Sequence, residues 1–397
     1  MKEFIFRGLA DTYRSLLGRR VRRGHTRQRG ARSLYLGAAA VGVGAMLSLQ
    51  AVVTIVDPFN LYPWSPSRAI PDQAQSDKLS MYLLRVAAKD NYDTVIAGGS
   101  TVLDFRAKDV EAYLPGVVRA VNLAYPMTEP GDLAVTLGEV SRMPNVRHVL
   151  IPLDYVYMMP TTFRFAAFPY KLYNNKLGNR FLAADRVAVQ LSFNLLLKGK
   201  LSARGSEHDD YEVEVRNLYA RTHSLQGIES LKEASTRSHA AMAEPAALDC
   251  HDFPALMQEF VPFAEAMSRQ GKTVDVLVPP YSFSFYTFLI DHPVFYKPRP
   301  TLDAHIALRR CAVSQLANLP NVRVFAFDDE PWLVEDEANF FDPGHVYHPE
   351  NYRYMLGEIA AGRHQLTPAN FDAYADSLRR RVLNYSYHST DLKDAGG

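Results

Sequence analysis

Five short apolar runs, rich in β-branched residues and bounded by turn residues, recur along the chain from residue 94 onward. Runs of this kind are typical of strands buried on both faces of a sheet. They occupy residues 94–97, 117–123, 146–153, 274–278 and 322–327. Helical patterns separate them, and parallel strands need such crossover connections. The alternation therefore predicts an α/β fold, a three-layer α/β/α sandwich around a mostly parallel five-stranded sheet.

The clearest helix precedes the fourth of these runs. Its apolar residues recur at spacings of three and four, which places them on one helical face. They are Phe253, Leu256, Met257, Phe260, Phe263, Ala264 and Met267. Gly271 follows, as expected where a helix gives way to a strand. This stripe indicates packing onto the sheet rather than a binding site.

Residues 33–56 contain no charged side chain. The run is long enough as a helix to cross about 30 Å of hydrocarbon, so it predicts a transmembrane helix. The arm before it carries ten lysine or arginine residues against two acidic ones, an excess that keeps this flank in the cytoplasm. We expect a single-pass type II protein of a bacterial inner (cytoplasmic) membrane, with the main domain in the periplasm or another extracytoplasmic space. A cleaved signal peptide is the alternative, but both regions are long for one.

Charge beyond the predicted span argues against a polyanionic partner. Residues 57–397 carry 34 basic and 41 acidic side chains, and the basic arm abuts a membrane span, where anionic lipid explains it. We therefore expect no nucleic-acid partner. Cys250 and Cys311 would lie in an oxidising compartment, where a disulfide and two buried thiols both stay open.

The domain organisation follows from these patterns. We expect a basic cytoplasmic arm at residues 1–32, the transmembrane helix at 33–56, a connector at 57–89 and an exported domain at 90–397. Residues 155–250 break the alternation of strands and helices, with an aromatic first part and a polar second part. They predict an insertion over the carboxyl edge of the sheet, where open α/β folds bind ligands.

Two short motifs at opposite ends of the domain offer the groups of a serine nucleophile. The first strand runs into Gly98, Gly99 and Ser100, and a later apolar stretch ends in Asp342, followed three residues on by His345. A serine hydroxyl needs a base to take its proton, and an imidazole serves when a carboxylate fixes its tautomer. The alternatives are that Ser100 only caps the next helix and that His345 is a surface residue beside an ordinary turn.

These motifs resemble the SGNH hydrolase superfamily, and within it the membrane-anchored branch that includes proteins of alginate acetylation and of teichoic acid D-alanylation. The resemblance spans roughly residues 90–362. It implies that Ser100 is the nucleophile, His345 the general base and Asp342 the acid that orients it. It also implies a glycan acceptor, an acyl donor and a partner, either a multi-span membrane acyltransferase or a polysaccharide synthase complex.

The middle of the chain departs from the superfamily pattern. Alanine stands near the expected glycine after the second strand, and Asp154 stands near the expected asparagine after the third. An ionised aspartate cannot donate a hydrogen bond to an oxyanion. Either Asn122 supplies the donor, or Asp154 has another role, or the site is degenerate. The candidates for oxyanion stabilisation or substrate binding are Gly99, Asn122, Asp154, Tyr125 and Tyr281, all near strand ends.

A metal centre is the other chemistry that these residues permit. Asp342, His345 and His348 fall within seven residues, but no cysteine or fourth ligand accompanies them. We predict neither a metal nor a cofactor.

The sequence thus predicts a membrane-anchored O-acyltransferase or esterase acting on a cell-envelope or exported polysaccharide. A non-catalytic polysaccharide-binding or scaffolding component of a membrane synthesis and secretion complex stays open as the alternative, as does a plain esterase with no polysaccharide role.

Overall fold

The computed structural model describes residues 26–57, 92–124, 128–163, 189–190, 192–193, 196–197, 248–283, 285–286, 301–336, 339–342, 344–346 and 348–385. The chain divides into two compact units, residues 1–55 and 56–397. The connector predicted at 57–89, apart from Asp57, and most of the insertion predicted at 155–250 lie outside the described residues.

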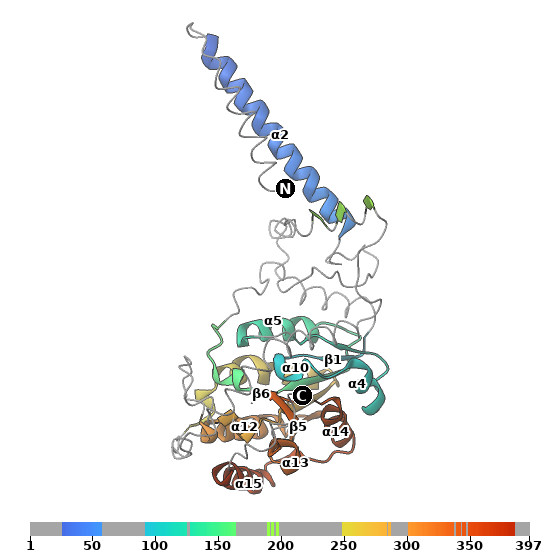
Figure 1. Ribbon diagram of the computed structural model, residues 1–397, viewed down its shortest axis with the longest axis vertical. Helices are drawn as coiled ribbons and strands as arrows, with labels where there is room; N and C mark the ends of the chain where they lie inside the picture. Colours follow the sequence, from blue (N-terminus) through green and yellow to red (C-terminus); the bar gives the residue numbers. More distant parts are fainter. Residues whose placement is uncertain are drawn as a thin grey trace, which may run out of the picture. The chain divides into compact units, whose positions relative to one another are not determined.

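Helix α2 (Thr26–Val56) is one continuous helix (Figure 1). Its stretch Leu34–Val56 is 23 residues long and apolar enough to cross a membrane, and no other helix in the described part of the chain has this property. At 1.5 Å per residue the stretch measures about 35 Å, which matches the apolar thickness of a bilayer. The helix coincides with the predicted span.

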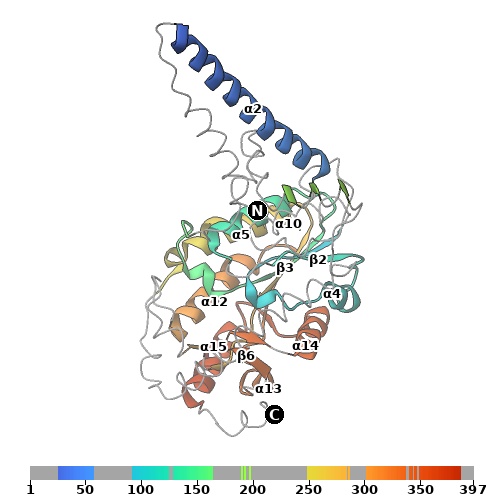
Figure 2. The ribbon, with the colours of Figure 1, turned by 45° about the horizontal axis from the view of Figure 1, so that its top comes forward.

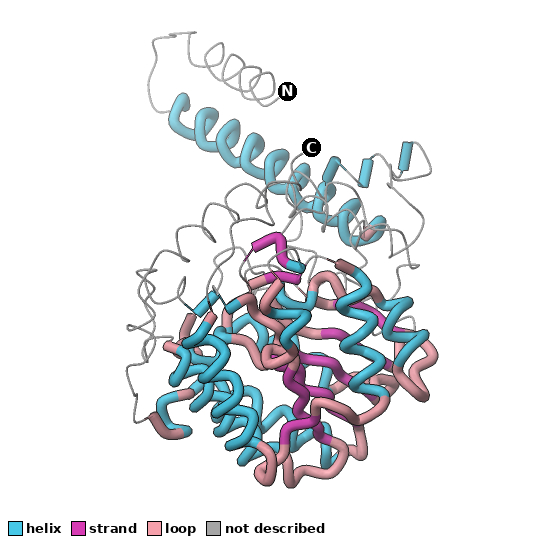
Figure 3. Tube along the Cα trace, turned by 60° about the horizontal axis from the view of Figure 1, so that its bottom comes forward, coloured by secondary structure: helices cyan, strands magenta, loops and turns pink. Residues whose placement is uncertain are grey.

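A six-stranded sheet forms the centre of the second unit, with the order β2-β1-β3-β4-β5-β8. The strands are β1 (Thr94–Ile96), β2 (Ala120–Asn122), β3 (His148–Pro152), β4 (Thr273–Val278), β5 (Val322–Ala326) and β8 (Gln365–Leu366). β1 to β5 run parallel, and β8 pairs antiparallel with β5. Figure 3 shows the strands as a continuous layer with helices packed beside it. The fold is therefore α/β with a mixed, mostly parallel sheet.

Four of the five predicted runs contain one of the parallel strands, and the run at 274–278 covers β4 except for Thr273, because the β-branched residues of these runs fill the buried positions of the sheet. The predicted number of strands was one too low. β8 is only two residues long and shows no periodicity, so hydrophobic patterning could not reveal it. A separate two-stranded hairpin, β6 (Phe340–Asp342) with β7 (His345–Val346), was not predicted, because β7 has only two residues and the pair lies outside the main sheet.

Helices connect the strands, as the alternation of patterns requires. They are α4 (Ala107–Tyr113), α5 (Pro130–Ser141), α10 (Val261–Arg269), α12 (Leu302–Leu316), α13 (Pro331–Val334), α14 (Pro349–Ala360) and α15 (Phe371–Asn384), with short 3-10 turns η1 (Ser100–Val102), η2 (Tyr155–Met158) and η5 (Cys250–Asp252). α4 packs on α14, whereas α10 packs on both α5 and α12 (Figure 2).

The helix predicted before β4 is real but begins irregularly. Residues Leu256–Phe260 (η6) form a π-helical turn that continues into α10. Pro262 lacks the N–H that an α-helix would use at this point, which favours such a local change. The helix ends in a glycine cap: Gly271 has φ +70°, and the N–H groups of Gly271 and Lys272 donate to the carbonyls of Ser268 and Met267.

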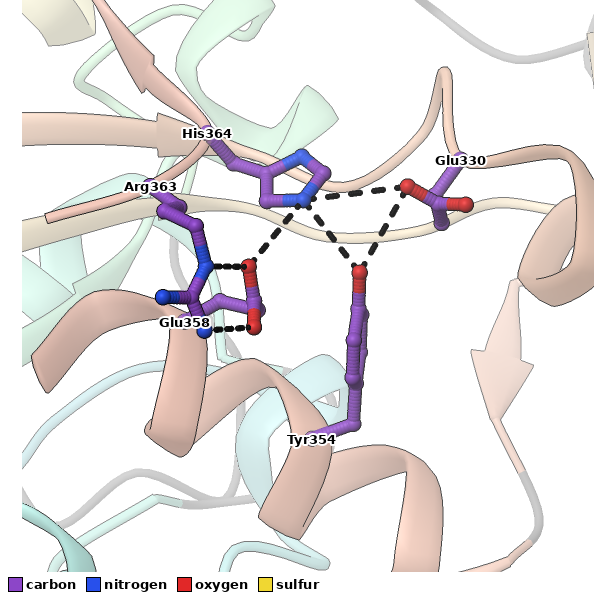
Figure 4. A network of polar contacts seen from close by, with 5 residues as sticks. All are labelled: Glu330, Tyr354, Glu358, Arg363 and His364. Atoms are coloured by element: carbon purple, nitrogen blue, oxygen red, sulfur yellow. Dashed lines mark hydrogen bonds and ion pairs between the residues drawn. The ribbon is translucent and has the colours of Figure 1, made fainter. Parts of the chain in front are cut away.

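A polar cluster joins the end of α14 to the β5–β8 edge (Figure 4). Arg363 donates two hydrogen bonds to Glu358, at 2.7 and 2.6 Å. His364 Nε2 lies 3.2 Å from the hydroxyl of Tyr354 and 3.7 Å from Glu330. The backbone of His364 has φ +59°, and its carbonyl accepts from Ala326 N–H at the end of β5. The cluster fixes α14, the helix that follows the hairpin carrying His345.

Cys250 and Cys311 form a disulfide between η5 and α12. The bond resolves the question that the sequence left open, and it ties the segment before α10 to the helix between β4 and β5. The two cysteines are 61 residues apart in the chain, so the bond closes a long loop.

We expect reduction of this disulfide, or the double substitution Cys250→Ser with Cys311→Ser, to lower the free energy of unfolding by about 2–4 kcal/mol, because the unfolded chain regains the entropy of that loop. Chemical denaturation of oxidised and reduced protein measures the difference. An unchanged midpoint would show that the bond contributes nothing to stability.

Candidate functional site

The site lies where the order of the sheet reverses. β1 is flanked by β2 and β3, so the chain moves one way from β1 to β2 and then crosses back past β1 to reach β3. The loops after β1 and β3 therefore leave the carboxyl edge in diverging directions, and open α/β sheets bind ligands at such a point. Ser100 follows β1, and Asp154 follows β3.

The glycine turn after β1 has no room for a side chain at its first position. A Cβ at Gly98 would lie 2.5 Å from Pro152 Cδ and 2.8 Å from Val102 Cγ2. The carbonyl of Gly98 accepts a hydrogen bond from Thr128 Oγ1, and Gly99 precedes the first residue of η1. This close approach of β1 and β3 places Ser100, which is partly exposed, at the start of the turn.

Asn122, at the end of β2, fixes the segment that follows Ser100. Its buried amide nitrogen lies 2.9–3.1 Å from the carbonyl oxygens of Val102, Leu103 and Phe105, and its oxygen accepts from Ala124 N–H. The two N–H groups of the side chain thus point to loop carbonyls. We therefore keep Asn122 out of the proposed oxyanion site and assign it the role of holding the loop.

The β6–β7 hairpin brings the second motif to the first. β7, which carries His345, lies against η1. Tyr352 of α14 holds β7 in place, because its hydroxyl donates to the carbonyl of Val346 and its ring packs edge-on against Phe105, in the loop that Asn122 clamps. Asp342 is paired with His345 across the hairpin. The side chain of Asp342 lies outside the described residues.

Asp154 is the most connected polar group at this point. The carboxylate is buried, and it accepts hydrogen bonds from Thr101 Oγ1 at 2.8 Å, from the Tyr281 hydroxyl at 2.7 Å and from the backbone N–H of Tyr155 at 2.5 Å. Thr101 is the neighbour of Ser100, and the charge of Asp154 also interacts with His345. Asp154 thus links the loops after β1, β3 and β4 to the hairpin.

Burial governs the electrostatics of these groups. It raises the pKa of Asp154, although hydrogen bonds from Tyr281, Thr101 and Tyr155 and the charge of His345 act in the opposite direction. Burial, together with the nearby charge of Asp154, holds the pKa values of Tyr157 and Tyr281 well above the usual range. Both tyrosines therefore stay neutral, and Tyr281 acts as a donor to the carboxylate.

The other residues predicted for the site differ in their exposure. Tyr281 is 1% exposed and stacks on Phe285 at 4.0 Å between ring centroids, so it acts beneath the site rather than on its surface. His348 is exposed and precedes α14. Tyr125 lies outside the described residues.

Sequence reasoning missed two residues of the rim, Thr101 and Glu129. Thr101 could have been noticed as a hydroxyl beside the proposed nucleophile. Glu129 begins α5 in a capping box with Asp132, and burial followed by the charge of Asp132 raises its pKa. Its position next to Thr128, which contacts Gly98, brings a further carboxyl to this edge of the sheet.

The described residues contain no cluster of three or more His, Cys, Asp or Glu side chains arranged to hold a metal ion. Comparison with protein-family models and with curated proteins finds no match to the chain.

Gly98→Ala should lower the free energy of unfolding by about 1–3 kcal/mol, because the added methyl group must displace Pro152 or Val102. Gly99→Ala is the matched control, since its Cβ would meet only Thr128 Cβ, at 3.9 Å. Thermal and denaturant unfolding of the two variants checks this. Equal stability of the two would contradict the packing described for the turn.

Proposed function

We propose that the second unit performs serine-dependent O-acyl chemistry on a cell-envelope or exported polysaccharide. The observation that supports this is the position of β7: a hairpin from the far end of the chain lies against the 3-10 turn that begins at Ser100. A buried carboxylate, that of Asp154, accompanies them: it accepts a hydrogen bond from Thr101 in this turn and interacts electrostatically with His345. Acyl transfer needs a nucleophile, a base and an acid close together, and the backbone segments that carry Ser100, His345 and Asp342 lie beside one another.

In the proposed mechanism Ser100 Oγ attacks the carbonyl carbon of an acyl ester while His345 takes the hydroxyl proton. The bond to the leaving alcohol then breaks, and that oxygen receives the proton from His345. A sugar hydroxyl, or water, next attacks the acyl-serine; His345 accepts its proton and returns it to Ser100. Asp342 orients the imidazole. Exclusion of water decides between transfer and hydrolysis.

With Asn122 held by the loop, the oxyanion would depend on backbone N–H groups of the Gly99–Thr101 turn, because the first N–H groups of a helical turn lack partners within it. The same observation favours one alternative. A site in which no side-chain amide is available to an oxyanion suits a non-catalytic polysaccharide-binding or scaffolding component of a membrane complex.

We also propose that the unit is a three-layer sandwich of the SGNH type. Two groups of helices support this, α4 with α14 and α5, α10 and α12 together. The connection from β1 to β2 runs in the opposite direction from the later ones. Right-handed crossovers would then place α4 on one face of the sheet and α5, α10 and α12 on the other.

A partner that delivers acyl groups across the membrane follows from the proposed acyl transfer.

The proposed location is the extracytoplasmic side of a bacterial inner membrane, with α2 as a type II anchor. The basic arm before the apolar stretch and the disulfide in the second unit support this topology. Alkaline phosphatase fused after residue 397 should be active in cells, since that reporter needs export to form its own disulfides. An inactive reporter on a stably produced fusion would reverse the topology.

Ser100→Ala should reduce kcat for hydrolysis of a small acetyl ester by roughly 10³-fold or more, because no hydroxyl is left to attack the ester. It should also abolish labelling by a serine-directed fluorophosphonate. Ser141→Ala, on α5 with its hydroxyl bonded to Gly138, is the control and should keep both properties. Acyl release measured with and without a glycan acceptor separates a transferase from a plain esterase.

A folded wild-type protein that neither cleaves the ester nor takes the label would exclude the enzyme. The scaffolding alternative would then stand, and it predicts polysaccharide binding that Ser100→Ala leaves unchanged.

A further inference from the structure

Three of the buried aspartates of the second unit, Asp154, Asp275 and Asp328, differ in what balances their charge. Asp328 pairs with Arg309 at 2.6 Å and accepts from the hydroxyl of Tyr374. Asp275 accepts two hydrogen bonds from Arg323, both at 2.8 Å. Each of these two carboxylates thus has a permanent cation beside it, as buried charges require.

Asp154 is as deeply buried but has no such partner among the described residues. It is 3% exposed, and its three hydrogen bonds come from neutral donors, a threonine, a tyrosine and a backbone amide. Strand β7, which carries His345, lies against η1, and Thr101 of η1 donates to Asp154. Among the described residues, His345 is thus the group near Asp154 that can become positive, and its charge interacts with the carboxylate. An imidazole is positive only when it holds the extra proton.

We propose that Asp154 is a positioning residue that stabilises the imidazolium formed at His345 when Ser100 loses its proton, while Thr101 ties the same carboxylate to the nucleophile's turn. This inference rests on the proposed function. It adds a second carboxylate to the site, next to Asp342, and gives Asp154 a role that its place in the sequence did not suggest.

The electrostatics support this role. Burial would raise the pKa of Asp275, but hydrogen bonds and charges from His148 and Arg323 outweigh it and hold that pKa below the usual range. The pKa of Asp154 stays raised. A carboxyl group whose pKa is raised by folding stabilises the folded state at low pH, and this contribution is lost as the pH rises through its folded-state pKa. Ionised Asp154 therefore destabilises the folded protein, and a positive charge nearby would offset this effect.

Among the described residues, the hydrogen-bond donors to Asp154 are neutral. The groups that face Asp154 are the hydroxyls of Thr101 and Tyr281, the N–H of Tyr155 and, through its charge, Tyr157. The tyrosines remain neutral. Asp342 stands opposite His345 in the hairpin, so it is the competing source of stabilisation and must be tested beside Asp154.

Asp154→Asn is the informative variant. Tyr281 and Tyr155 donate to the same oxygen of Asp154, so the Asn oxygen can accept from both, and its amide can donate to Thr101. The hydrogen bonds therefore survive while the buried charge is gone. We expect an unchanged or higher denaturation midpoint, a kcat lowered roughly 10- to 1,000-fold, and a KM that changes little. The pKa of His345 should fall, followed by NMR of the full-length protein labelled with ¹³C-histidine, with His345→Gln identifying the resonance.

Asp275→Asn is the matched control, a buried aspartate of the neighbouring strand β4. It removes a charge that the permanent cation of Arg323 stabilises, so its denaturation midpoint should fall. The His345 titration should not move. We thus expect Asp154→Asn to lower the pKa of His345 without loss of stability, and Asp275→Asn to lower stability without a change in that pKa.

The inference is overturned if the pKa of His345 in Asp154→Asn equals the wild-type value. The contradiction is plainest if Asp342→Asn lowers the pKa of His345 and Asp154→Asn does not. Ester cleavage and phosphonate labelling by the wild type would then still support the proposed function. If the wild type shows neither reaction, the proposed function fails, and a lowered His345 pKa in Asp154→Asn would still establish the pairing of the two residues.

Discussion

The reversal of strand order at β1 is the constraint on which the site depends. Because β1 lies between β2 and β3, the loops leaving these strands diverge at one place on the carboxyl edge. The close contact of Gly98 with Pro152 brings β1 and β3 together there, and Asn122 at the end of β2 holds the segment after Ser100. The β6–β7 hairpin then has a fixed surface on which to lie, and the packing of Tyr352 on Phe105 makes hairpin and loop one assembly.

Buried polar groups do two kinds of work in this unit. Arg309, Asp328, Tyr286 and Tyr374 form a closed network in which each charge and hydroxyl has a partner. Such a network specifies packing and has nothing left for a ligand. Asp154 is held by neutral donors instead, so its charge remains available to a group that changes protonation. A buried carboxylate of this kind lowers stability, and that cost is characteristic of functional sites.

The sequence predicts those parts of the molecule whose signals are local or periodic. The five parallel strands follow from their β-branched runs, α2 from its uncharged length, and the cap at Gly271 from glycine's access to positive φ. β7 and β8 have only two residues each, and β6 pairs with β7 outside the main sheet, so these elements exist through tertiary contacts and leave no periodic signal. The disulfide needs the distance between η5 and α12, which spacing cannot supply. Asn122 and Asp154 were noticed as polar residues at strand ends, but their partners lie on other elements.

Because the amide of Asn122 is bonded to the loop, the glycine turn after β1 would have a second role besides presenting Ser100. If a side-chain amide met the oxyanion, the turn would need only to present Ser100. With that amide bonded to the carbonyls of Val102, Leu103 and Phe105, charge developing on a substrate oxygen would have to meet the backbone N–H groups of the Gly99–Thr101 turn. The direction of these groups depends on the path of the backbone through Gly98, which the contact with Pro152 restricts to a residue without a Cβ. The same close packing of β1 on β3 would then determine both the stability of the turn and its ability to bind an oxyanion.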